Sequence, residues 1–388
     1  MFNFMLASLA VASSLQSLAS ASAISPRAPR PWNNFNNNVV FTPPTSWVDP
    51  RTLYARTLQL SDKSLLITCE IYSPEDPLSL PIFRSTDGGA TWKEHSRFRD
   101  QVNGWGMAYQ PILYSLPERF GGYPAGTILA VGTSLPSNKS HAYIDMYAST
   151  DCAKTFKFLS HVAYGPGPET VLNGDKAIWE AFLLMYKGKL IVYYSDQRDP
   201  RYGQKLVHTT TTDLRKWSPI VNDVAMDYYD GRPGMTTVAH IPINNNYIMT
   251  FENCGAPVEN CQVNYIVSND PTKFFGKPIQ PIVSNDTAAM SPYGSPFIIW
   301  APLKAGSKDG ILIANGNSDS DVYINDYRAL PENWMRVNIN QKNGYSRDLR
   351  VIKDNRGNLK LLVASGGNFG EADTNALIVG VVDIPQKV

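Results

Sequence analysis

The feature that most constrains the fold of this chain is a unit that recurs six times along its 388 residues. Each copy has a short apolar segment, a polar turn and a second apolar segment, as in EAFLLMYKGKLIVYYSD. Short apolar runs bounded by Gly, Asn and Pro are typical of β-strands, and long helical periodicity is nearly absent. The copies start roughly 50 to 70 residues apart, a spacing typical of repeat folds. They span residues 55–70, 110–132, 180–196, 237–252, 296–315 and 348–365.

Six such units predict an all-β fold, a six-bladed β-propeller with four antiparallel strands in each blade. We expect a single domain over residues 24–388. Residues 38–41 (NVVF) are expected to pair with the last blade and close the ring, because closure removes exposed strand edges that would otherwise aggregate. Residues 24–37 are expected to form an extended lead-in to the ring.

A second repeat lies in the turns. Residues 85–92 read STDGGATW and match the pattern S-x-D-x-G-x-x-W at all four marked positions. The pattern predicts a tight turn in which the Asp side chain accepts backbone N–H groups, Gly takes a positive φ and Trp packs beneath. It resembles the Asp box of sialidase-like β-propellers. Degenerate copies, which keep the acid and an aromatic residue but lose glycine, begin at Ser149, Thr211, Ser268 and Asn325.

The charge of the chain excludes some classes of function. It has 35 Lys and Arg against 34 Asp and Glu, a net charge of +1, whereas a nucleic-acid-binding protein carries a basic excess. Aromatic residues make up 11% of the chain, so it can bury a large core and is not a disordered protein. The neutral charge and the closed ring predict a monomer without a nucleic-acid partner.

The N-terminus predicts secretion. Residues 1–23 form a short apolar segment that ends in ASA at 21–23, which is the form of a signal-peptidase site. No later segment is long and apolar enough to span a bilayer, so we expect no membrane partner. Two sequons, at Asn138 and Asn285, agree with an extracellular glycoprotein.

The four cysteines allow disulfides in an oxidising compartment. Cys254 and Cys261 are close in sequence and are expected to form a disulfide that closes one loop. Cys69 and Cys152 are the leftover pair, and the sequence leaves open whether they are bridged. No Cys and His spacing indicates a zinc site, and the chain has only five His, so we expect no bound metal.

Two glutamates stand where a propeller places its functional residues. The first strand of a blade begins, and the second ends, at the same face of the ring. Glu180 opens a first strand and Glu252 closes a second strand of the next blade. Paired carboxyl groups are what glycoside hydrolysis requires, since one must donate a proton and the other must be ionised. The alternative is that both are solvated residues at the rim.

Other polar and aromatic residues are expected at the same face, where they would bind a sugar. Asp196 and Arg198 have the alternative of pairing with each other. Arg347, with Asp348 and Arg350, has the alternative of a structural ion-pair network at the ring closure. The aromatic residues have the alternative of a place in the core. The substrate-binding candidates are Arg56, Tyr109, Gln110, Trp179, Asp196, Arg198, Asn315 and Arg347.

Two segments, 178–200 (IWEAFLLMYKGKLIVYYSDQRDP) and 248–254 (IMTFENC), resemble glycoside hydrolase family 93. The resemblance implies a secreted exo-acting α-1,5-L-arabinanase that releases arabinobiose from the non-reducing end of linear arabinan, a polysaccharide of pectin, with retention of configuration. It implies that Glu180 is the nucleophile, Glu252 the general acid/base, and Tyr345 a tyrosine that hydrogen-bonds the nucleophile. It implies no cofactor. Retention also implies carboxyl groups about 5–5.5 Å apart.

Exo action requires that one end of the channel mouth is blocked, and segments 103–126 and 255–264 are expected to build that wall. Three alternatives stay open. A sialidase would use an arginine triad and a tyrosine nucleophile, but Arg56 is followed by Thr57-Leu58 and not by Ile-Pro. A non-catalytic sugar-binding propeller would not need an acid–base pair. An endo-arabinanase would need an open groove across the face.

Overall fold

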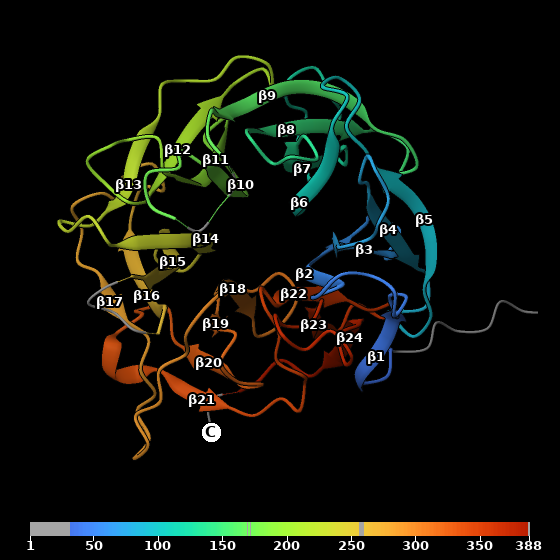
Figure 1. Ribbon diagram of the computed structural model, residues 1–388. Helices are drawn as coiled ribbons and strands as arrows, with labels where there is room; N and C mark the ends of the chain where they lie inside the picture. The colour runs from blue at the N-terminus through green and yellow to red at the C-terminus, as the bar shows by residue number, and fades with distance from the viewer. Residues whose placement is uncertain (1–31, 169, 171, 256–259, 387–388) are drawn as a thin grey trace, which may run out of the picture.

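The computed structural model describes residues 32–168, 170, 172–255 and 260–386. It is an all-β ring of six four-stranded antiparallel sheets around a central channel, as the repeated units predict (Figure 1). In these residues the one helical element is a short turn, η1 (Pro331–Asn333). None of the helical structure there is long and apolar enough to cross a membrane. The predicted signal peptide, residues 1–23, lies outside the described residues.

The first three blades follow one another along the chain, each with its strands in sequence order. Blade 1 contains β2 (Thr52–Gln59), β3 (Leu65–Ile71), β4 (Leu80–Ser85) and β5 (Lys93–Phe98). Blade 2 contains β6 (Gly106–Ser115), β7 (Ile128–Leu135), β8 (Ala142–Ser149) and β9 (Lys157–Gly165). Blade 3 contains β10 (Ile178–Tyr186), β11 (Lys189–Asp196), β12 (Lys205–Thr211) and β13 (Val221–Ala225).

The last three blades repeat this order until the ring closes. Blade 4 contains β14 (Arg232–Ile241), β15 (Asn246–Cys254), β16 (Gln262–Ser268) and β17 (Gln280–Pro281). Blade 5 contains β18 (Phe297–Pro302), β19 (Gly310–Asn315), β20 (Val322–Asn325) and β21 (Met335–Val337). Blade 6 contains β22 (Asp348–Lys353), β23 (Leu359–Ser365), β24 (Leu377–Val382) and the N-terminal strand β1 (Phe35–Phe41).

Strand β1 closes the ring, as predicted for residues 38–41, and it begins three residues earlier. It runs antiparallel to β24, with Asn38 opposite Val379 and Phe41 opposite Leu377 (Figure 1). The Asn38 side chain also donates to the backbone carbonyls of Gly89 and Ala90 in blade 1, at 2.9 Å each. The N-terminal strand therefore joins the first blade to the last.

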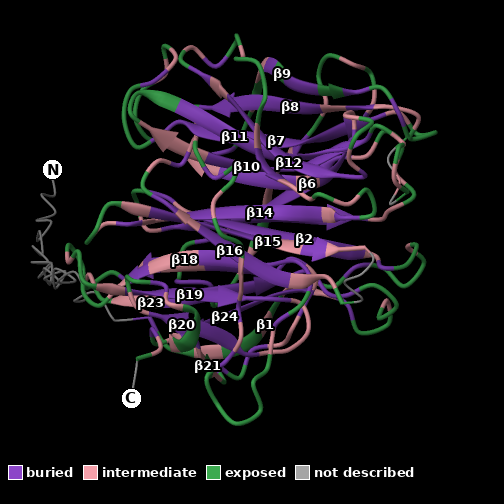
Figure 2. Cartoon of the chain, turned by 90° about the vertical axis from the view of Figure 1, so that its left-hand side faces the viewer, coloured by how far each residue is buried: buried purple, intermediate pink, exposed green. Residues whose placement is uncertain are grey.

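The core lies between neighbouring blades. Leu66 and Ile82 of blade 1, for example, share an apolar cluster with Leu113 and Ala130 of blade 2. Both faces of an inner strand are covered in this way, and β3 is buried along its whole length. Figure 2 shows that most of the strand residues in the other blades are buried and that the exposed residues lie mainly in the loops. This explains why the inner strands have continuous apolar sequences and not alternating ones.

The Asp-box turn has the geometry that its sequence predicts. Ser85 Oγ accepts the Gly89 N–H at 2.8 Å, and Asp87 accepts both the N–H and the hydroxyl of Thr91, at 2.9 and 2.6 Å. Trp92 Nε1 donates back to the Gly89 carbonyl at 2.9 Å. Gly88 and Gly89 have φ of 78° and 93°, a region that favours glycine. The turn thus satisfies its own polar groups.

The degenerate copies keep this network without glycine. In blade 2, Asp151 accepts the N–H groups of Lys154 and Thr155 at 3.0 Å. Cys152 and Ala153 take the two left-handed positions, with φ of 61° and 64°. The copies in blades 1 to 5 all connect the third strand to the fourth. They therefore lie at the face opposite the one where the second strands end.

A residue with a positive φ lies at the start of every first strand; in blades 5 and 6 it stands two residues before the strand, and no shift in register accompanies it. In β2, β6, β10 and β14 the register with the second strand shifts at this point, which is a β-bulge. We call the residue at this place in each blade the bulge residue; its φ lies between 46° and 68°. A bulge changes the direction in which its side chain and N–H point. The six bulge residues are Tyr54, Gln110, Glu180, Met235, Ser295 and Ser346.

We predict that Asp87→Ala lowers the free energy of unfolding by about 1–3 kcal/mol, since it leaves the Thr91 N–H and hydroxyl without their acceptor. Denaturant unfolding followed by tryptophan fluorescence measures the change. Asp309→Ala is the matched control, because Asp309 is exposed and its carboxylate accepts no hydrogen bond in the described part of the chain. An equal effect of both substitutions would contradict the role of the turn.

Candidate active site

Glu180 is the bulge residue of β10, and its carboxyl group is buried at the channel mouth. One of its oxygens, Oε2, accepts the Ser195 hydroxyl at 2.7 Å and the Met235 N–H at 2.8 Å. Ser195 lies on the next strand of the same blade, whereas Met235 is the bulge residue of blade 4. Burial raises the pKa of Glu180, while these two hydrogen bonds and Arg232 act in the opposite direction. Donors from two neighbouring blades thus bind this carboxyl group.

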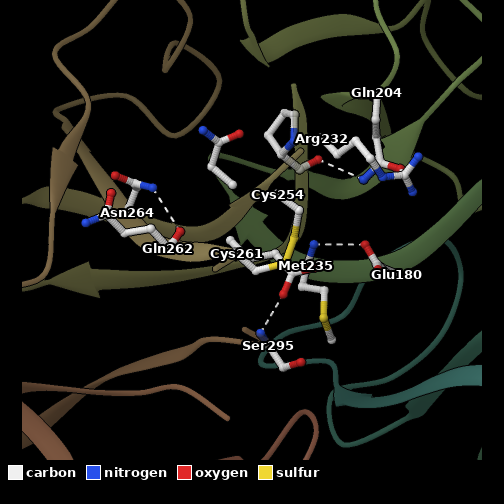
Figure 3. The surroundings of a disulfide bond; sticks show 12 residues. Glu180, Gln204, Arg232, Met235, Cys254, Cys261, Gln262, Asn264 and Ser295 are labelled. Atoms are coloured by element: carbon white, nitrogen blue, oxygen red, sulfur yellow. Dashed lines mark hydrogen bonds between the residues drawn. A yellow bond between two sulfur atoms is a disulfide. The ribbon is translucent and has the colours of Figure 1, made fainter. Parts of the chain in front are cut away.

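Glu252 lies near the end of β15, and its Oε2 accepts the N–H of Ser295, the bulge residue of blade 5, at 2.6 Å. Figure 3 shows the Met235 N–H donating to Glu180. Ser295 and the Cys254–Cys261 disulfide lie on the side of Met235 that faces away from Glu180. Burial raises the pKa of Glu252 to about 7, and the negative charge of Glu180 adds to this shift. Glu252 therefore keeps its proton closer to neutral pH than a solvated glutamate does.

Gly234 separates the two carboxyl groups. A Cβ atom at this position would lie 3.3 Å from Oε2 of Glu180 and 3.4 Å from Oε1 of Glu252. These two oxygens are therefore at most about 6.7 Å apart. A side chain at residue 234 would occupy the space between them, so the close approach requires glycine. The structure thus brings the two predicted glutamates together.

Arg232, at the start of β14, was not among the residues selected from the sequence. Charge interactions link its guanidinium to both Glu180 and Glu252. It donates to Asn173 Oδ1 at 2.7 Å and to Gln204 Oε1 at 3.3 Å, and it lies 5.9 Å from the centre of the Trp179 ring. The sequence signal that could have found Arg232 is its place at the start of a first strand, as for Arg56.

Tyr345 lies beside the carboxyl pair. Its ring packs against Tyr54 and Phe369, with centroids 6.4 and 4.9 Å away. Burial and the charges of Glu180 and Glu252 raise its pKa well above the usual value, so the phenol stays protonated. In the described residues its hydroxyl makes no hydrogen bond to Glu180. A phenol held in this form is poorly suited to be the nucleophile of a sialidase.

Three predicted sugar-binding residues make hydrogen bonds to a neighbouring blade. Arg56 donates to the carbonyls of Ala55 and Ser346, at 2.8 and 2.9 Å. Arg347 is fully buried and donates to the carbonyls of residues 320 and 321. Asn315 accepts the N–H of residue 297 and donates to the Arg347 carbonyl. Burial lowers the pKa of Arg347 to about 10.

The remaining candidates also have partners within the protein. Asp196 and Arg198 form a two-pronged ion pair at 2.8 and 2.9 Å, which is the alternative that the sequence left open. Trp179 and Tyr109 are largely buried. The Gln110 side chain accepts the hydroxyl of Thr133 at 2.7 Å. None of these contacts involves Glu180 or Glu252 directly.

The Cys254–Cys261 disulfide is present as predicted. Its sulfur atoms and the Glu252 carboxylate all lie within 4.8 Å of one another. Cys69 and Cys152 are both free thiols, which settles the question that the sequence left open. The bridge therefore anchors the segment after β15 directly beside Glu252.

The expected wall differs from the structure. Of segment 103–126, only the residues before β6 lie at the same face as the carboxyl pair. Residues 116–126 form the turn after β6 at the opposite face, where Gly121 packs against Leu214 in the Asp-box turn of blade 3. That part of the prediction is wrong, because the length of a segment does not tell at which end of a strand it lies. Residues 256–259 of the second expected segment lie outside the described residues.

A cavity of about 540 Å³ occupies the channel itself. Neither Glu180 nor Glu252 lines it. The rings of Phe182 and Phe297, with centroids 6.2 Å apart, are part of its wall. Its lining is mostly apolar, so it offers little for acid–base chemistry. Residues from all six first strands contribute, among them Leu58, Ile112, Leu183, Val238, Ile299 and Val351.

Two buried carboxyl groups from adjacent blades, with one pKa raised to about 7, define the glycosidase class of propeller. Solved structures lead to the same class. The α-L-arabinofuranosidase of Fusarium graminearum, of glycoside hydrolase family 93 and in complex with arabinobiose, is 43% identical, with a TM-score of 0.84 over 90% of this chain and 98% of that chain. The α-L-arabinanase of Penicillium chrysogenum, complexed with arabinobiose, is 41% identical with the same TM-score and coverage.

This chain therefore belongs to glycoside hydrolase family 93, as its two sequence segments predicted, and it is a glycoside hydrolase. A protein of unknown function from Dyadobacter fermentans shares the fold alone, at a TM-score of 0.59 and 12% identity. No protein-family model matches the chain, and no curated protein does.

We predict that Glu252→Gln makes the folded protein more stable at pH 8 and leaves its stability at pH 4 almost unchanged. With a folded pKa of about 7, Glu252 keeps its proton over a range where the unfolded chain has lost it, so stability falls as the pH rises from about 4.5 to 7. Glutamine removes this loss, which amounts to about 3 kcal/mol. Thermal unfolding as a function of pH measures it. Glu118→Gln, at an exposed residue, is the control, and an equal gain there would refute the assignment.

Proposed function

We propose that this chain is a secreted exo-acting enzyme that hydrolyses linear α-1,5-L-arabinan and releases arabinobiose from the non-reducing end with retention of configuration. The observation that carries the proposal is the pair of buried carboxyl groups on either side of Gly234. The two family members solved with arabinobiose, from Fusarium graminearum and Penicillium chrysogenum, support the choice of sugar.

The surroundings of the two glutamates favour different roles. Glu180 accepts two hydrogen bonds on one oxygen, which stabilise its ionised form. Glu252 accepts one, from Ser295, and the charge of Glu180 raises its pKa further. Hydrogen bonds that favour the ionised form of one carboxyl group, beside a second carboxyl group whose pKa is raised to about 7, can supply one base and one acid at the same pH. We assign Glu180 as the nucleophile and Glu252 as the general acid/base.

The reaction then has two steps. Glu252 gives its proton to the leaving oxygen while Glu180 attacks the anomeric carbon, and a covalent arabinosyl-enzyme forms. Glu252 then takes a proton from water, which attacks the anomeric carbon and frees Glu180 and the disaccharide. The upper limit of about 6.7 Å between these two oxygens is compatible with the separation of about 5–5.5 Å between the carboxyl groups of retaining enzymes.

Charged groups beside the reacting sugar stabilise the transition state. The sugar ring acquires positive oxocarbenium character, which the Glu180 carboxylate stabilises at close range. Arg232 balances the two acids when both are ionised. Tyr345, a neutral phenol beside the pair, is a positioning residue for the sugar or for Glu180.

Secretion is supported by two kinds of feature besides the signal-like residues 1–23, the disulfide and the exposed sequons. The disulfide is typical of proteins from oxidising compartments. Both sequon asparagines, Asn138 and Asn285, are exposed, so a glycosyltransferase can reach them in the folded protein.

We predict that Glu180→Gln and Glu252→Gln each lower kcat on linear debranched arabinan by at least about 1,000-fold, because each removes one half of the acid–base pair. Product chromatography should show arabinobiose for the wild type. With azide, Glu252→Ala should give arabinobiosyl azide of retained configuration, and Glu180→Ala that of inverted configuration. Wild-type rates in either glutamine variant, with Glu118→Gln as the control, would overturn the assignment.

We predict that the double substitution Cys254→Ser and Cys261→Ser lowers kcat/KM on arabinan at least about tenfold at a temperature where the variant is fully folded. The bridge fixes the backbone next to Glu252, and small displacements of a catalytic group are costly. Cys152→Ser, at an exposed free thiol, is the control. Unchanged kinetics in the double variant would show that the bridge serves stability alone.

A further inference from the structure

Five aromatic rings lie together on blade 2, apart from the catalytic pair. Tyr143, near the start of β8, stacks with Trp105 and with His161, at centroid distances of 5.6 and 4.1 Å. The Tyr164 ring, near the end of β9, lies 4.9 Å from the Tyr143 ring, and His141 meets the Trp105 ring edge-on at 4.6 Å. We call this group the aromatic platform; its members are Trp105, His141, Tyr143, His161 and Tyr164.

The platform lies at the face of the ring that carries the catalytic pair. Trp105 directly precedes β6, and the first strands begin at that face. The second strands end there, so β8 begins there with Tyr143 near its start, and β9 ends there with Tyr164 near its end. In Figure 1, β6 lies at the channel and β9 at the outer edge of the ring. Tyr143 is two strands out from β6, or about 10 Å at the usual strand spacing.

A series of contacts joins the platform to the catalytic pair. Arg198, in the segment after β11 of blade 3, donates to the backbone carbonyl of Tyr164 at 3.1 Å. Arg198 is also the ion-pair partner of Asp196, and the residue before Asp196 is Ser195, which donates to Glu180. In the described residues, no hydrogen bond joins a platform ring to either catalytic glutamate. The platform is thus a neighbour of the channel mouth and not part of it.

The fold does not require these rings. Across the described ranges, none of them belongs to an apolar core cluster, and Tyr164 is 42% exposed. Tyr164 is the next-to-last residue of its fourth strand. The same place is taken by Arg97 in blade 1 and Arg336 in blade 5, each in a salt bridge. Aromatic side chains that are exposed together mark a binding surface.

The chemistry of the platform suits an uncharged sugar polymer. The Tyr143 and Tyr164 hydroxyls and the Trp105 indole N–H have no partner in the part of the chain that the structure describes, and none of them is enclosed in the protein. His161 binds Asp145 through Nδ1 at 2.6 Å, which leaves Nε2 for a ligand. Aromatic rings supply flat apolar surfaces for the C–H face of a sugar, and polar groups at their edges bind its hydroxyls.

The platform meets a different stretch of polymer from the one that is cleaved. In the proposed reaction the cleaved chain ends two sugars from the broken bond, and the rest of it leaves on the side of Glu252 in blade 4. Blade 3 lies between that side and the platform. The sugars at the platform therefore belong to a distant part of the same chain or to a neighbouring chain.

We propose that the aromatic platform is a second binding site for arabinan, which holds the polymer on the enzyme while chain ends enter the mouth. The proposal rests on the function proposed above. Binding at one site raises the effective concentration of tethered chain ends at the other, so the platform lowers KM for the polymer without changing the chemistry at Glu180. An oligosaccharide too short to reach both sites gains nothing.

The test is Tyr164→Ala in the full chain, assayed on linear debranched arabinan and on arabinotetraose. We expect KM for the polymer to rise at least about threefold, as for the loss of one aromatic contact. Its kcat on the polymer and its kcat/KM on arabinotetraose should stay within about 1.5-fold of wild type. Tyr327→Ala is the matched control, because Tyr327 is 40% exposed and follows the Asp-box turn of blade 5 at the opposite face. All proteins are deglycosylated first, since the sequon at Asn138 lies three residues before His141.

Affinity electrophoresis in gels that contain arabinan measures the platform without catalysis. In a Glu180→Gln background, which prevents digestion of the gel, Tyr164→Ala and Trp105→Ala should each raise the dissociation constant at least about threefold. Tyr327→Ala should leave it unchanged. If Tyr164→Ala does not fold, Trp105→Ala decides.

Unchanged retardation and unchanged KM for the polymer overturn the proposal. An equal loss on arabinan and on arabinotetraose also overturns it, because the rings would then act in the mouth itself. Protein that neither cleaves arabinan nor is retarded by it overturns the proposed function and this inference together. Retardation that Tyr164→Ala weakens, in a wild type that releases no arabinobiose, overturns the proposed function and supports the platform, whereas an active wild type with unaffected variants overturns this inference alone.

Discussion

The site depends on one kind of interaction, a hydrogen bond from the bulge residue of one blade to a carboxyl group of the blade before it. Met235 donates to Glu180, Ser295 to Glu252 and Gln110 to Glu70. The bulge makes this possible because it turns a backbone N–H out of the strand ladder and towards the channel mouth. No blade holds its own carboxyl group completely, so the site exists only when neighbouring blades are packed together.

The same arrangement works against stability. Three carboxyl groups are buried where water would solvate them better, and burial is the largest cause of the raised pKa of each. The ring stays folded despite this cost because the apolar side chains buried between its blades stabilise it through the hydrophobic effect. The position that Glu70 and Glu252 occupy near the end of the second strand carries Thr133 and Ser195 in blades 2 and 3, which donate to the bulge residues Gln110 and Glu180. Blades with the same strand order therefore carry different side chains at this position.

Local sequence patterns predicted the six units, the ring closure and the Asp-box turns, because each depends on neighbouring residues or on strand order. The meeting of Glu180 and Glu252 followed from the same order, while their chemical roles remain proposals. Arg56, Arg347 and Asn315 were chosen for their chemical type, but no sequence pattern shows their partners, which are backbone groups and, for Arg56, also the Ser346 hydroxyl. Gly234 and Arg232 were missed because their importance comes from contacts between blades. The predicted wall at the channel mouth was partly wrong because the length of a segment does not tell at which face of the ring the segment lies.

The ring closure has a consequence for how the chain is assembled. Phe35 pairs with Val381, so the contact that closes the ring joins residues nearly the whole chain apart, and contacts so distant in sequence are slow to form. The carboxyl pair, in contrast, is built by residues 178–297, which follow one another without interruption. The two glutamates are thus kept in one covalently continuous part of the ring, whereas the seam is held by strand pairing and by the packing of Phe35, Val40 and Phe41 against blades 1 and 6.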